Sequence, residues 1–294
     1  MHVLVHGGAG SAPEEPEPRQ AVLDEAATDG AETSRPEAAV IAAVRRLESN
    51  PRFNAGRGSA VQTDGVVRTD AGLMTGDGAC GAAAAMEGVE HAVEVARVVK
   101  EETPHVLVAG DRALALAEAF DIDTGRDLWT DRSRESWAEA TEDGDPGETV
   151  PQQIAWLRDR FGEAGPEEDH DTVGAVATDG QRLAAATSTG GRSFALAGRV
   201  GDVPQVGAGF FASDTAAASA TGEGEAIARF GLARKAVEAV EDGDDPQTAA
   251  DRVIRGFEAE TGGKAGLIVT DSEGAGGEAR NTEMMQTATG RRER

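Results

Sequence analysis

Short apolar runs alternate with amphipathic segments along the whole chain. A short apolar run bounded by glycine or by polar turn residues predicts a strand. The runs at 61 and 66–68 are separated by Thr63-Asp64-Gly65, a pattern that indicates a hairpin. The other predicted strands are 3–5, 71–74, 80–86, 106–109, 173–177, 183–187, 206–211, 215–219 and 267–270, and the last of these is expected to close the chain.

Apolar residues spaced three and four positions apart predict helices between these strands. Pro36 is well suited to the first turn of a helix, and Pro104 is expected to stop one. The predicted helices are 19–31, 36–49, 91–102, 111–120, 151–161, 224–240 and 246–260. Several strands precede helices in each half without a regular β-α-β alternation, and this order favours an α+β layered fold over a doubly wound one.

The composition changes between residues 131 and 169, where "EATEDGDPGE" and "EAGPEED" flank one predicted helix. Low hydrophobicity and high charge predict a mobile linker here. The chain of 294 residues is long enough for one large domain or two small ones. We expect a single domain whose two halves are joined by this linker.

The charge balance narrows the possible partners. The net charge is -25, with 53 acidic residues against 28 basic ones. Nucleic acid and anionic membranes need clustered Lys and Arg, so neither is expected as a partner. Lysine occurs only at Lys100, Lys235 and Lys264, and tyrosine is absent. This composition favours a salt-adapted protein over one whose acidity merely keeps it soluble.

Cysteine and histidine usage argues against a disulfide or a zinc site. Cys80 is the single cysteine, and its alanine-rich surroundings predict a small buried side chain. The five histidines show no metal-ligand spacing. The sequence "MHVLVHGGAG" has no features of a signal peptide, and no apolar segment is long enough to span a membrane. A cytoplasmic, soluble protein is expected, with no cofactor for its chemistry.

Glycines lie next to the histidine and threonine residues that are candidates for binding or catalysis. "HGGAG" at 6–10 follows a strand, and a tight turn explains it better than an anion cradle because the dinucleotide fingerprint is incomplete. Threonines stand beside glycines in "DHDTVGAVA", "TSTGG" and "TGEGE". These glycines would let a ligand or another backbone approach the hydroxyl groups closely.

Thr172 lies at the boundary between the acidic segment and an apolar strand. A threonine within a chain is a poor nucleophile without a neighbouring base. If the bond between Asp171 and Thr172 were cut, Thr172 would gain an α-amine with a pKa of about 7.7 to 8.0, suited to a general base near neutrality. On spacing alone, the residues favour a threonine that simply begins a strand after a loop.

The motifs, taken together and in order, resemble those of plant-type L-asparaginases with isoaspartyl peptidase activity, which are N-terminal nucleophile hydrolases. The likeness covers nearly the whole chain. Its motifs are "HGGAG", "FNAGRGS", "DAGLMTGDG", "GVEHAVEVARVVKEETPHVLVAG", "HDTVGAVA", "ATSTGG", "GRVGDVPQVGAG" and "TGEGE".

The resemblance implies a four-layer αββα sandwich and an inactive precursor that cuts itself between Asp171 and Thr172. The products would be an alpha subunit, 1–171, with a mobile acidic tail from about 131, and a beta subunit, 172–294. The cut chains would stay together, and two such heterodimers would pair.

The resemblance also implies a role for each site residue. Thr172 would attack the side-chain amide of asparagine or the isopeptide carbonyl of a β-aspartyl dipeptide, and form a covalent β-aspartyl intermediate. The implied supporting groups are Thr189 beside the nucleophile, Thr221 and Gly222 at the oxyanion, Asn54 near the nucleophile, and Arg199, Asp202, Gly191 and Gly222 around the substrate. Without the resemblance, Arg199 and Asp202 would be taken for a surface ion pair.

The loop at about 47–59 resembles one that wraps a structural sodium ion through backbone carbonyls. Its candidate residues are Leu47, Glu48, Phe53, Ala55 and Arg57.

Three positions depart from the usual pattern, namely Asp171, Val203 and Arg57. Asp171 before the threonine resembles the "HDT" of glycosylasparaginases, and this favours a second hypothesis, a glycosylasparaginase-like amidase. A third hypothesis is a non-processing small-molecule-binding relative. A fourth is a nucleotide-binding protein that uses "HGGAG".

Overall fold

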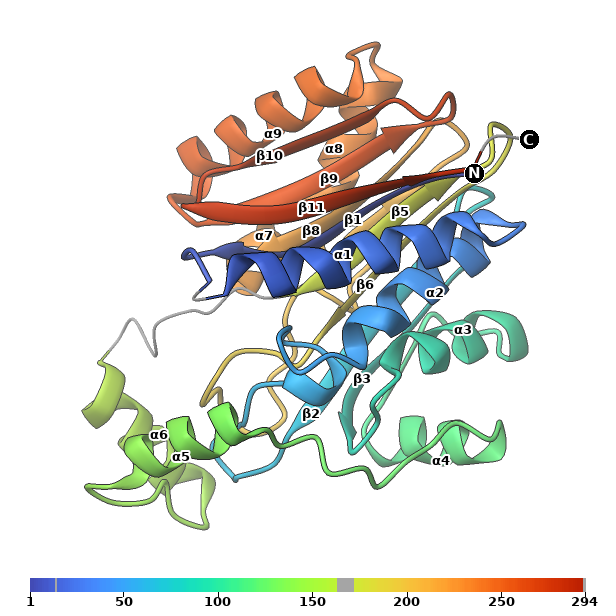
Figure 1. Cartoon of the computed structure of the whole chain (residues 1–294). Helices are drawn as coiled ribbons and strands as arrows, with labels where there is room; N and C mark the ends of the chain where they lie inside the picture. Colours follow the sequence, from blue (N-terminus) through green and yellow to red (C-terminus); the bar gives the residue numbers. More distant parts are fainter. Residues whose placement is uncertain (14, 163–171, 293–294) are drawn as a thin grey trace.

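The computed structural model describes residues 1–13, 15–162 and 172–292, which form two β-sheets with helices on their outer faces (Figure 1). The seven-stranded sheet has the order β11-β1-β5-β6-β2-β3-β4. Its strands are β1 (His2–Gly10), β2 (Arg68–Thr75), β3 (Cys80–Glu87), β4 (Leu107–Ala109), β5 (Val173–Thr178), β6 (Leu183–Thr189) and β11 (Met284–Arg291). The four-stranded sheet, in the order β10-β9-β8-β7, contains β7 (Phe210–Ala212), β8 (Ala216–Gly222), β9 (Ala265–Asp271) and β10 (Gly276–Arg280).

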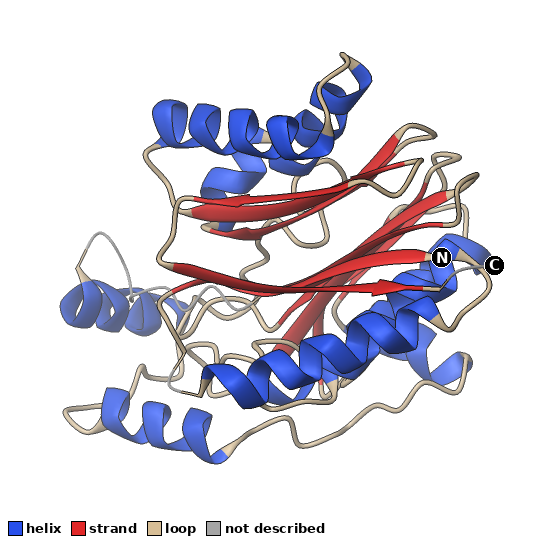
Figure 2. Cartoon of the chain, turned by 45° about the horizontal axis from the view of Figure 1, so that its top comes forward, coloured by secondary structure: helices blue, strands red, loops and turns tan. Residues whose placement is uncertain are grey.

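The helices cover the outer faces of the two sheets, while the inner faces meet each other (Figure 2). On the seven-stranded sheet lie α1 (Pro16–Ala31), α2 (Pro36–Glu48), α3 (Ala92–Glu102) and α4 (Asp111–Ala119). On the four-stranded sheet lie α7 (Gly224–Phe230), α8 (Leu232–Glu241) and α9 (Pro246–Thr261). The helices α5 (Asp131–Thr141) and α6 (Val150–Phe161) lie near the beginning of β2. The short 3-10 helix η1 (Gly56–Gly58) follows α2 in the sequence.

Small side chains allow the two sheets to pack closely. The inter-sheet core is built largely from alanine, with larger side chains such as Leu183, Phe210 and Ile268. A Cβ atom at Gly72 would overlap the ring of Phe210, so the absent side chain of β2 provides the space that the aromatic ring of β7 fills. The α+β class predicted from the order of elements is confirmed.

The structure corrects four expectations about individual elements. The predicted helix 224–240 is two helices, because Gly231 adopts a left-handed backbone with φ 74° that ends α7 before α8 begins. The predicted strand 206–211 contributes only β7 and one isolated bridge at Val206. The strand at 267–270 does not close the chain, since β10 and β11 follow it. Cys80 is half-buried at the start of β3 rather than fully buried.

The segment predicted to be a mobile linker contains more regular structure than its composition suggests. It forms α5 in addition to the predicted α6, and each helix begins with a capping box, at Thr130 and Thr149 respectively. All three tryptophans of the chain, Trp129, Trp137 and Trp156, lie in or beside these helices. The end of the segment, from 163 to 171, lies outside the described residues.

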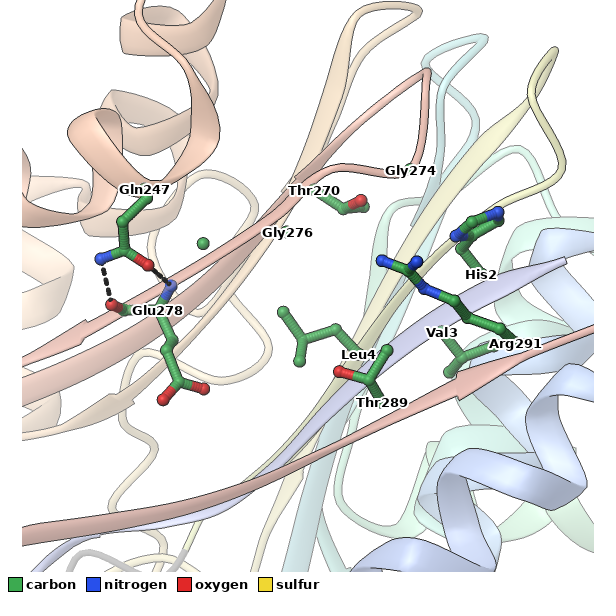
Figure 3. Close-up of a pocket in the computed structure, with 11 residues that line it drawn as sticks. His2, Val3, Leu4, Gln247, Thr270, Gly274, Gly276, Glu278, Thr289 and Arg291 are labelled. Atoms are coloured by element: carbon green, nitrogen blue, oxygen red, sulfur yellow. Dashed lines mark hydrogen bonds between the residues drawn. The ribbon is translucent and has the colours of Figure 1, made fainter.

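A cavity of about 360 Å³ opens where the two sheets meet, between β1 and β11 on one side and β9 and β10 on the other (Figure 3). Gly274 and Gly276 are among its lining residues, and the Gln247 amide at its wall makes two hydrogen bonds to the Glu278 backbone. None of the candidate threonines lines this cavity as the structure describes it. No helix within the described ranges is long and apolar enough to cross a membrane.

Candidate active site

The two central threonines are brought together by strand pairing. Thr172 directly precedes β5 and Thr189 ends β6, and the pairing of Val173 with Ser188 places the two side by side. The Thr172 Oγ1 donates a hydrogen bond to Thr189 Oγ1 at 3.2 Å, and Thr189 Oγ1 accepts another from the Gly191 backbone N–H at 3.1 Å. Both side chains are more than nine-tenths buried. Thr172 and Thr189 are therefore in direct contact.

A layer of buried polar side chains lies beside the Thr172 backbone, between the two sheets. His6 Nε2 is 2.8 Å from Ser219 Oγ, which is 2.8 Å from Thr187 Oγ1. Burial lowers the pKa of His6 to about 3, and the neighbouring Thr172 backbone acts more weakly in the opposite direction. His6 is thus neutral near pH 7 and does not serve as a proton carrier there.

Gly174 makes this layer possible. Strand register places His6, Gly174 and Thr187 side by side across β1, β5 and β6. A Cβ atom at Gly174 would overlap both Ser219 Oγ and His6 Nε2. The glycine in "TVGAVA" is therefore required by the close approach of side chains from two other strands, β1 and β8.

Thr221 and Gly222, predicted to hold the oxyanion, end β8 close to this group. Thr221 is fully buried. Gly222 has φ 136° and lines the same cavity as Thr172 and Thr189, while Thr221 does not reach its wall. A Cβ atom at Gly222 would overlap the Lys264 carbonyl oxygen, so a larger residue cannot take this position without moving β9.

Asn54 fixes one wall of the cavity through both ends of its amide. Its Nδ2 donates to the Gly191 carbonyl at 2.6 Å, and its Oδ1 accepts from the Ala60 backbone N–H at 2.8 Å. The Gly190 N–H in turn donates to the Asn54 carbonyl at 2.8 Å. Asn54 therefore holds the segment after β6 against the loop that follows α2.

Arg199 forms an ion pair with Glu225, and not the surface ion pair with Asp202 that would be expected without the family resemblance. Its Nε and Nη2 donate to the two carboxylate oxygens of Glu225 at 2.8 and 2.7 Å, and no ion pair joins Arg199 to Asp202 in the described structure. Burial alone would lower the pKa of Arg199, but the Glu225 carboxylate outweighs it and the pKa is raised. Burial alone would raise the pKa of Glu225, but the Arg199 guanidinium outweighs this effect and the pKa is lowered.

Asp202 is 4% exposed, and its Oδ2 has no hydrogen-bond partner among the described residues. Burial raises the pKa of Asp202 to about 7, with a smaller opposing effect from the Arg199 charge. A buried carboxylate oxygen without a partner is costly, so it is a strong indication of a missing cationic or hydrogen-bonding ligand.

One small cavity gathers most of the predicted site. It is lined by Asn54, Thr172, Thr189, Gly191, Arg192, Arg199, Gly201, Asp202, Gly222 and Gly224. Asp171, the other half of the predicted cleavage site, lies outside the described residues.

Sequence reasoning missed three charged residues of this region. Glu225 is the last residue of "TGEGE", and a search for carboxylates that could pair with Arg199 would have found it. Arg192 lines the cavity directly after "TSTGG". Asp70, opposite Thr189 in the β2–β6 register, is buried, and burial raises its pKa to about 6. No local sequence signal connects Asp70 with Thr189, because the contact depends on strand register.

The loop after α2 packs tightly around Gly56. A Cβ atom at Gly56 would overlap the Glu48 carbonyl oxygen and lie 2.7 Å from that of Glu90. The Glu48 carboxylate has a separate use, since its Oε1 accepts from the Val93 N–H at 3.0 Å and from Ser188 Oγ at 2.6 Å. No group of acidic, histidine or cysteine side chains within the described ranges could hold a metal ion.

This arrangement defines a class of chemistry. A buried hydroxyl pair lies in one cavity with a guanidinium and an unpartnered carboxylate. The two charges can bind the carboxylate and ammonium groups of an amino acid, while the hydroxyl attacks a carbonyl on its side chain.

Comparison with known proteins agrees with this class. The sequence matches the family model described as Asparaginase over residues 1–294. The plant-type L-asparaginase of Pyrococcus abyssi is 38% identical over 299 residues, covering 97% of this chain and 95% of the relative. The isoaspartyl peptidase/L-asparaginase of Danio rerio is 36% identical over 283 residues, covering 92% and 86% respectively. The chain belongs to the asparaginase family, and it is therefore an amidohydrolase.

Proposed function

We propose that the protein hydrolyses L-asparagine to L-aspartate and ammonia, and also cleaves β-aspartyl dipeptides, after cutting itself between Asp171 and Thr172. The observation that carries the proposal is the single cavity that holds the Thr172–Thr189 hydroxyl pair together with Arg199 and the unpartnered Asp202 carboxylate. The names of the relatives, plant-type L-asparaginase and isoaspartyl peptidase/L-asparaginase, support both activities.

In the proposed maturation, Thr172 Oγ1 attacks the Asp171 carbonyl carbon. The acyl group moves from the Thr172 nitrogen to its oxygen, and water then hydrolyses the ester. The products are a new carboxylate on Asp171 and a free α-amine on Thr172. That amine has an ordinary pKa of about 7.7 to 8.0, so a useful fraction is neutral near pH 8 and can act as a base.

In the proposed hydrolysis, the Thr172 amine takes the hydroxyl proton as Oγ1 attacks the side-chain amide carbon of the substrate. The tetrahedral intermediate collapses, and its nitrogen leaves as ammonia with the transferred proton. Water attacks the resulting β-aspartyl ester, the same amine acts as base, and aspartate is released. Thr189 holds the attacking oxygen in place through the 3.2 Å contact.

Two further groups complete the proposed reaction. Arg199 binds the substrate α-carboxylate and Asp202 accepts hydrogen bonds from its α-ammonium, with Gly191 and Gly222 shaping the space between them. The Thr221 hydroxyl and the Gly222 backbone N–H stabilise the oxyanion. Donors fixed in a buried site need no reorganisation as the negative charge develops.

We further infer the molecular organisation that accompanies this activity. The two sheets and their outer helices correspond to a four-layer αββα sandwich of the N-terminal nucleophile type. The mature protein would consist of subunits 1–171 and 172–294, and two such heterodimers would pair. The cytoplasm is the proposed location.

Two proposals concern ions. A structural sodium ion is proposed in the loop that includes Leu47, Glu48, Phe53, Ala55 and Arg57, where backbone carbonyls would be its ligands. Replacing NaCl with choline chloride at equal ionic strength should then lower the melting temperature.

The net charge of -25 supports salt adaptation, which predicts a melting temperature that rises with KCl concentration into the molar range.

Intact-mass analysis and ammonia release test the proposed function together. The purified wild-type protein should give two polypeptides divided before Thr172 and should release ammonia from L-asparagine. Thr172→Ala should remain one chain and release none, while Thr172→Ser should cleave and turn over more slowly. Thr28→Ala, on the exposed face of α1, is the matched control. An uncut wild-type chain with full ammonia release would contradict the mechanism.

A further inference from the structure

The loop between β6 and β7 connects two charged residues of the cavity, Arg192 and Arg199. Phe194 lies in this loop with φ 56° and is 8% exposed. A bulky residue rarely adopts the left-handed region, and it does so only where the surroundings hold it there. The conformation of the loop that leads to Arg199 is thus imposed by tertiary contacts of Phe194.

The Phe194 ring contacts α5 and α6, while its backbone N–H donates to the Val61 carbonyl at 2.7 Å. The Phe194 ring stacks on Phe161, with 5.7 Å between centroids and 12° between planes. It also meets Trp156 at 6.1 Å and 70°, and Trp137 at 6.1 Å. All three partners belong to the α5–α6 hairpin, residues 131–161, which has few other large apolar side chains.

A hydrogen-bonded connection reinforces the aromatic one. Thr63 Oγ1 donates to Gln153 Oε1 of α6 at 3.0 Å and accepts from the Ala197 backbone N–H at 3.0 Å. Gln153 is 5% exposed, so this pair is shielded from water. The loop is therefore held between α6 and the turn at Thr63, immediately before Arg199.

We propose that the α5–α6 hairpin is a positioning element for substrate binding, which fixes the 192–199 loop through Phe194 and Gln153 and so places the Arg199 guanidinium for the substrate carboxylate. This inference rests on the proposed function. No residue of α5 or α6 lines the cavity in the described structure, so the hairpin acts through the loop. The hairpin lies before the proposed cleavage site in the sequence, and the 192–199 loop lies after it. The subunit 1–171 would therefore tune the substrate affinity of a site that is carried largely by the subunit 172–294.

Trp156→Ala and Trp156→Phe test the role of the aromatic contacts. Loss of the contact should raise the KM for L-asparagine about tenfold and leave kcat and self-cleavage within about twofold, and the phenylalanine variant should recover most of the loss. Gln153→Ala tests the second connection and should raise KM severalfold with the same retention of kcat. Phe257→Leu, which alters the aromatic pair between Phe230 of α7 and Phe257 of α9, is the control for general destabilisation.

Hydrogen exchange gives a readout that does not depend on activity. Backbone amides of residues 192–199 should exchange faster in Trp156→Ala than in Trp156→Phe or in Phe257→Leu. An unchanged KM in an active Trp156→Ala protein, or unchanged exchange in this loop, would overturn the inference. A wild-type protein that releases no ammonia would instead contradict the proposed function, and the exchange comparison would still decide the role of the hairpin.

Discussion

Glu225 binds the Arg199 guanidinium with both carboxylate oxygens, at 2.8 Å from Nε and 2.7 Å from Nη2. The remaining nitrogen, Nη1, lies beside Gly201 in the cavity wall. One edge of the planar guanidinium is therefore held by Glu225, and Nη1 lies outside this pair. Glu225 sets the orientation in which Arg199 meets a substrate carboxylate.

Glu225→Gln should weaken substrate binding. A charge-assisted hydrogen bond contributes about 1.5–3 kcal/mol, and its loss here should raise the KM for L-asparagine by roughly tenfold or more. The value of kcat should change little, because Glu225 does not contact Thr172 in the described structure. Steady-state kinetics would measure both constants, with exposed Glu238→Gln as a control for the lost charge. A lower KM would mean that Glu225 competes with the substrate for Arg199 instead of orienting it.

The activity should rise with pH through neutrality. Burial raises the pKa of Asp202 to about 7, and only the ionised carboxylate can accept hydrogen bonds from a substrate ammonium group while balancing its charge. The Thr172 amine must also lose its proton before it can act as a base. Two deprotonations therefore precede reaction, and log kcat/KM should increase with a slope approaching two below pH 7.

Asp202→Asn separates the two ionisations. The variant should lose roughly one to two orders of magnitude in kcat/KM, and the slope of its acid limb should fall to about one because only the Thr172 amine still titrates. In Glu225→Gln the acid limb should move to lower pH, since the Glu225 charge contributes to the raised pKa of Asp202. A slope that stays near two in Asp202→Asn would assign the second ionisation to another group.

The proposed oxyanion donors can be tested at Thr221. Thr221→Val keeps the shape of a fully buried side chain but removes its hydroxyl. Loss of one such donor typically lowers kcat by about 100- to 1,000-fold, and KM should stay nearly constant because the ground-state carbonyl carries little charge. Thr221→Ser restores the hydroxyl and should recover most of the rate. Equal effects of Val and Ser would indicate a packing role for this residue.

The roles proposed for the site residues rest on the family resemblance, whereas the positions of these residues along the chain follow a local pattern. Thr172, Thr189 and Gly222 each lie at the end of a strand beside glycine or an apolar run, and that pattern is local in sequence. Strand pairing then brings these ends together. The partner of Arg199 could not be deduced in the same way, because Glu225 is reached only when the loop after β6 folds back on the start of α7.

The missed elements depend on distant contacts as well. The α5 sequence is polar, and its few apolar residues include Trp137, whose partner Phe194 lies far along the chain. Hydrophobicity within a short window does not detect such a pair. The break between α7 and α8 did have a local signal at Gly231, whose left-handed conformation ends a helix at little cost.

Gly174→Ala should destabilise the protein and disturb Thr172. The added methyl group would overlap Ser219 Oγ and His6 Nε2, two fully buried groups that cannot move without breaking the polar layer. Overpacking of this kind costs about 1–3 kcal/mol, so the free energy of unfolding should fall by that amount and self-cleavage should slow. Gly256→Ala is the matched control, because its Cβ would meet only Phe230 at 3.9 Å on the exposed side of α9. The free energy of unfolding of Gly256→Ala should rise by roughly 0.5–1 kcal/mol because alanine has a higher helix propensity than glycine. Urea unfolding measures the free energy of unfolding of both variants. Equal stabilities in the two variants would show that the space around Gly174 adapts, and that the His6–Ser219 contact does not require a glycine there.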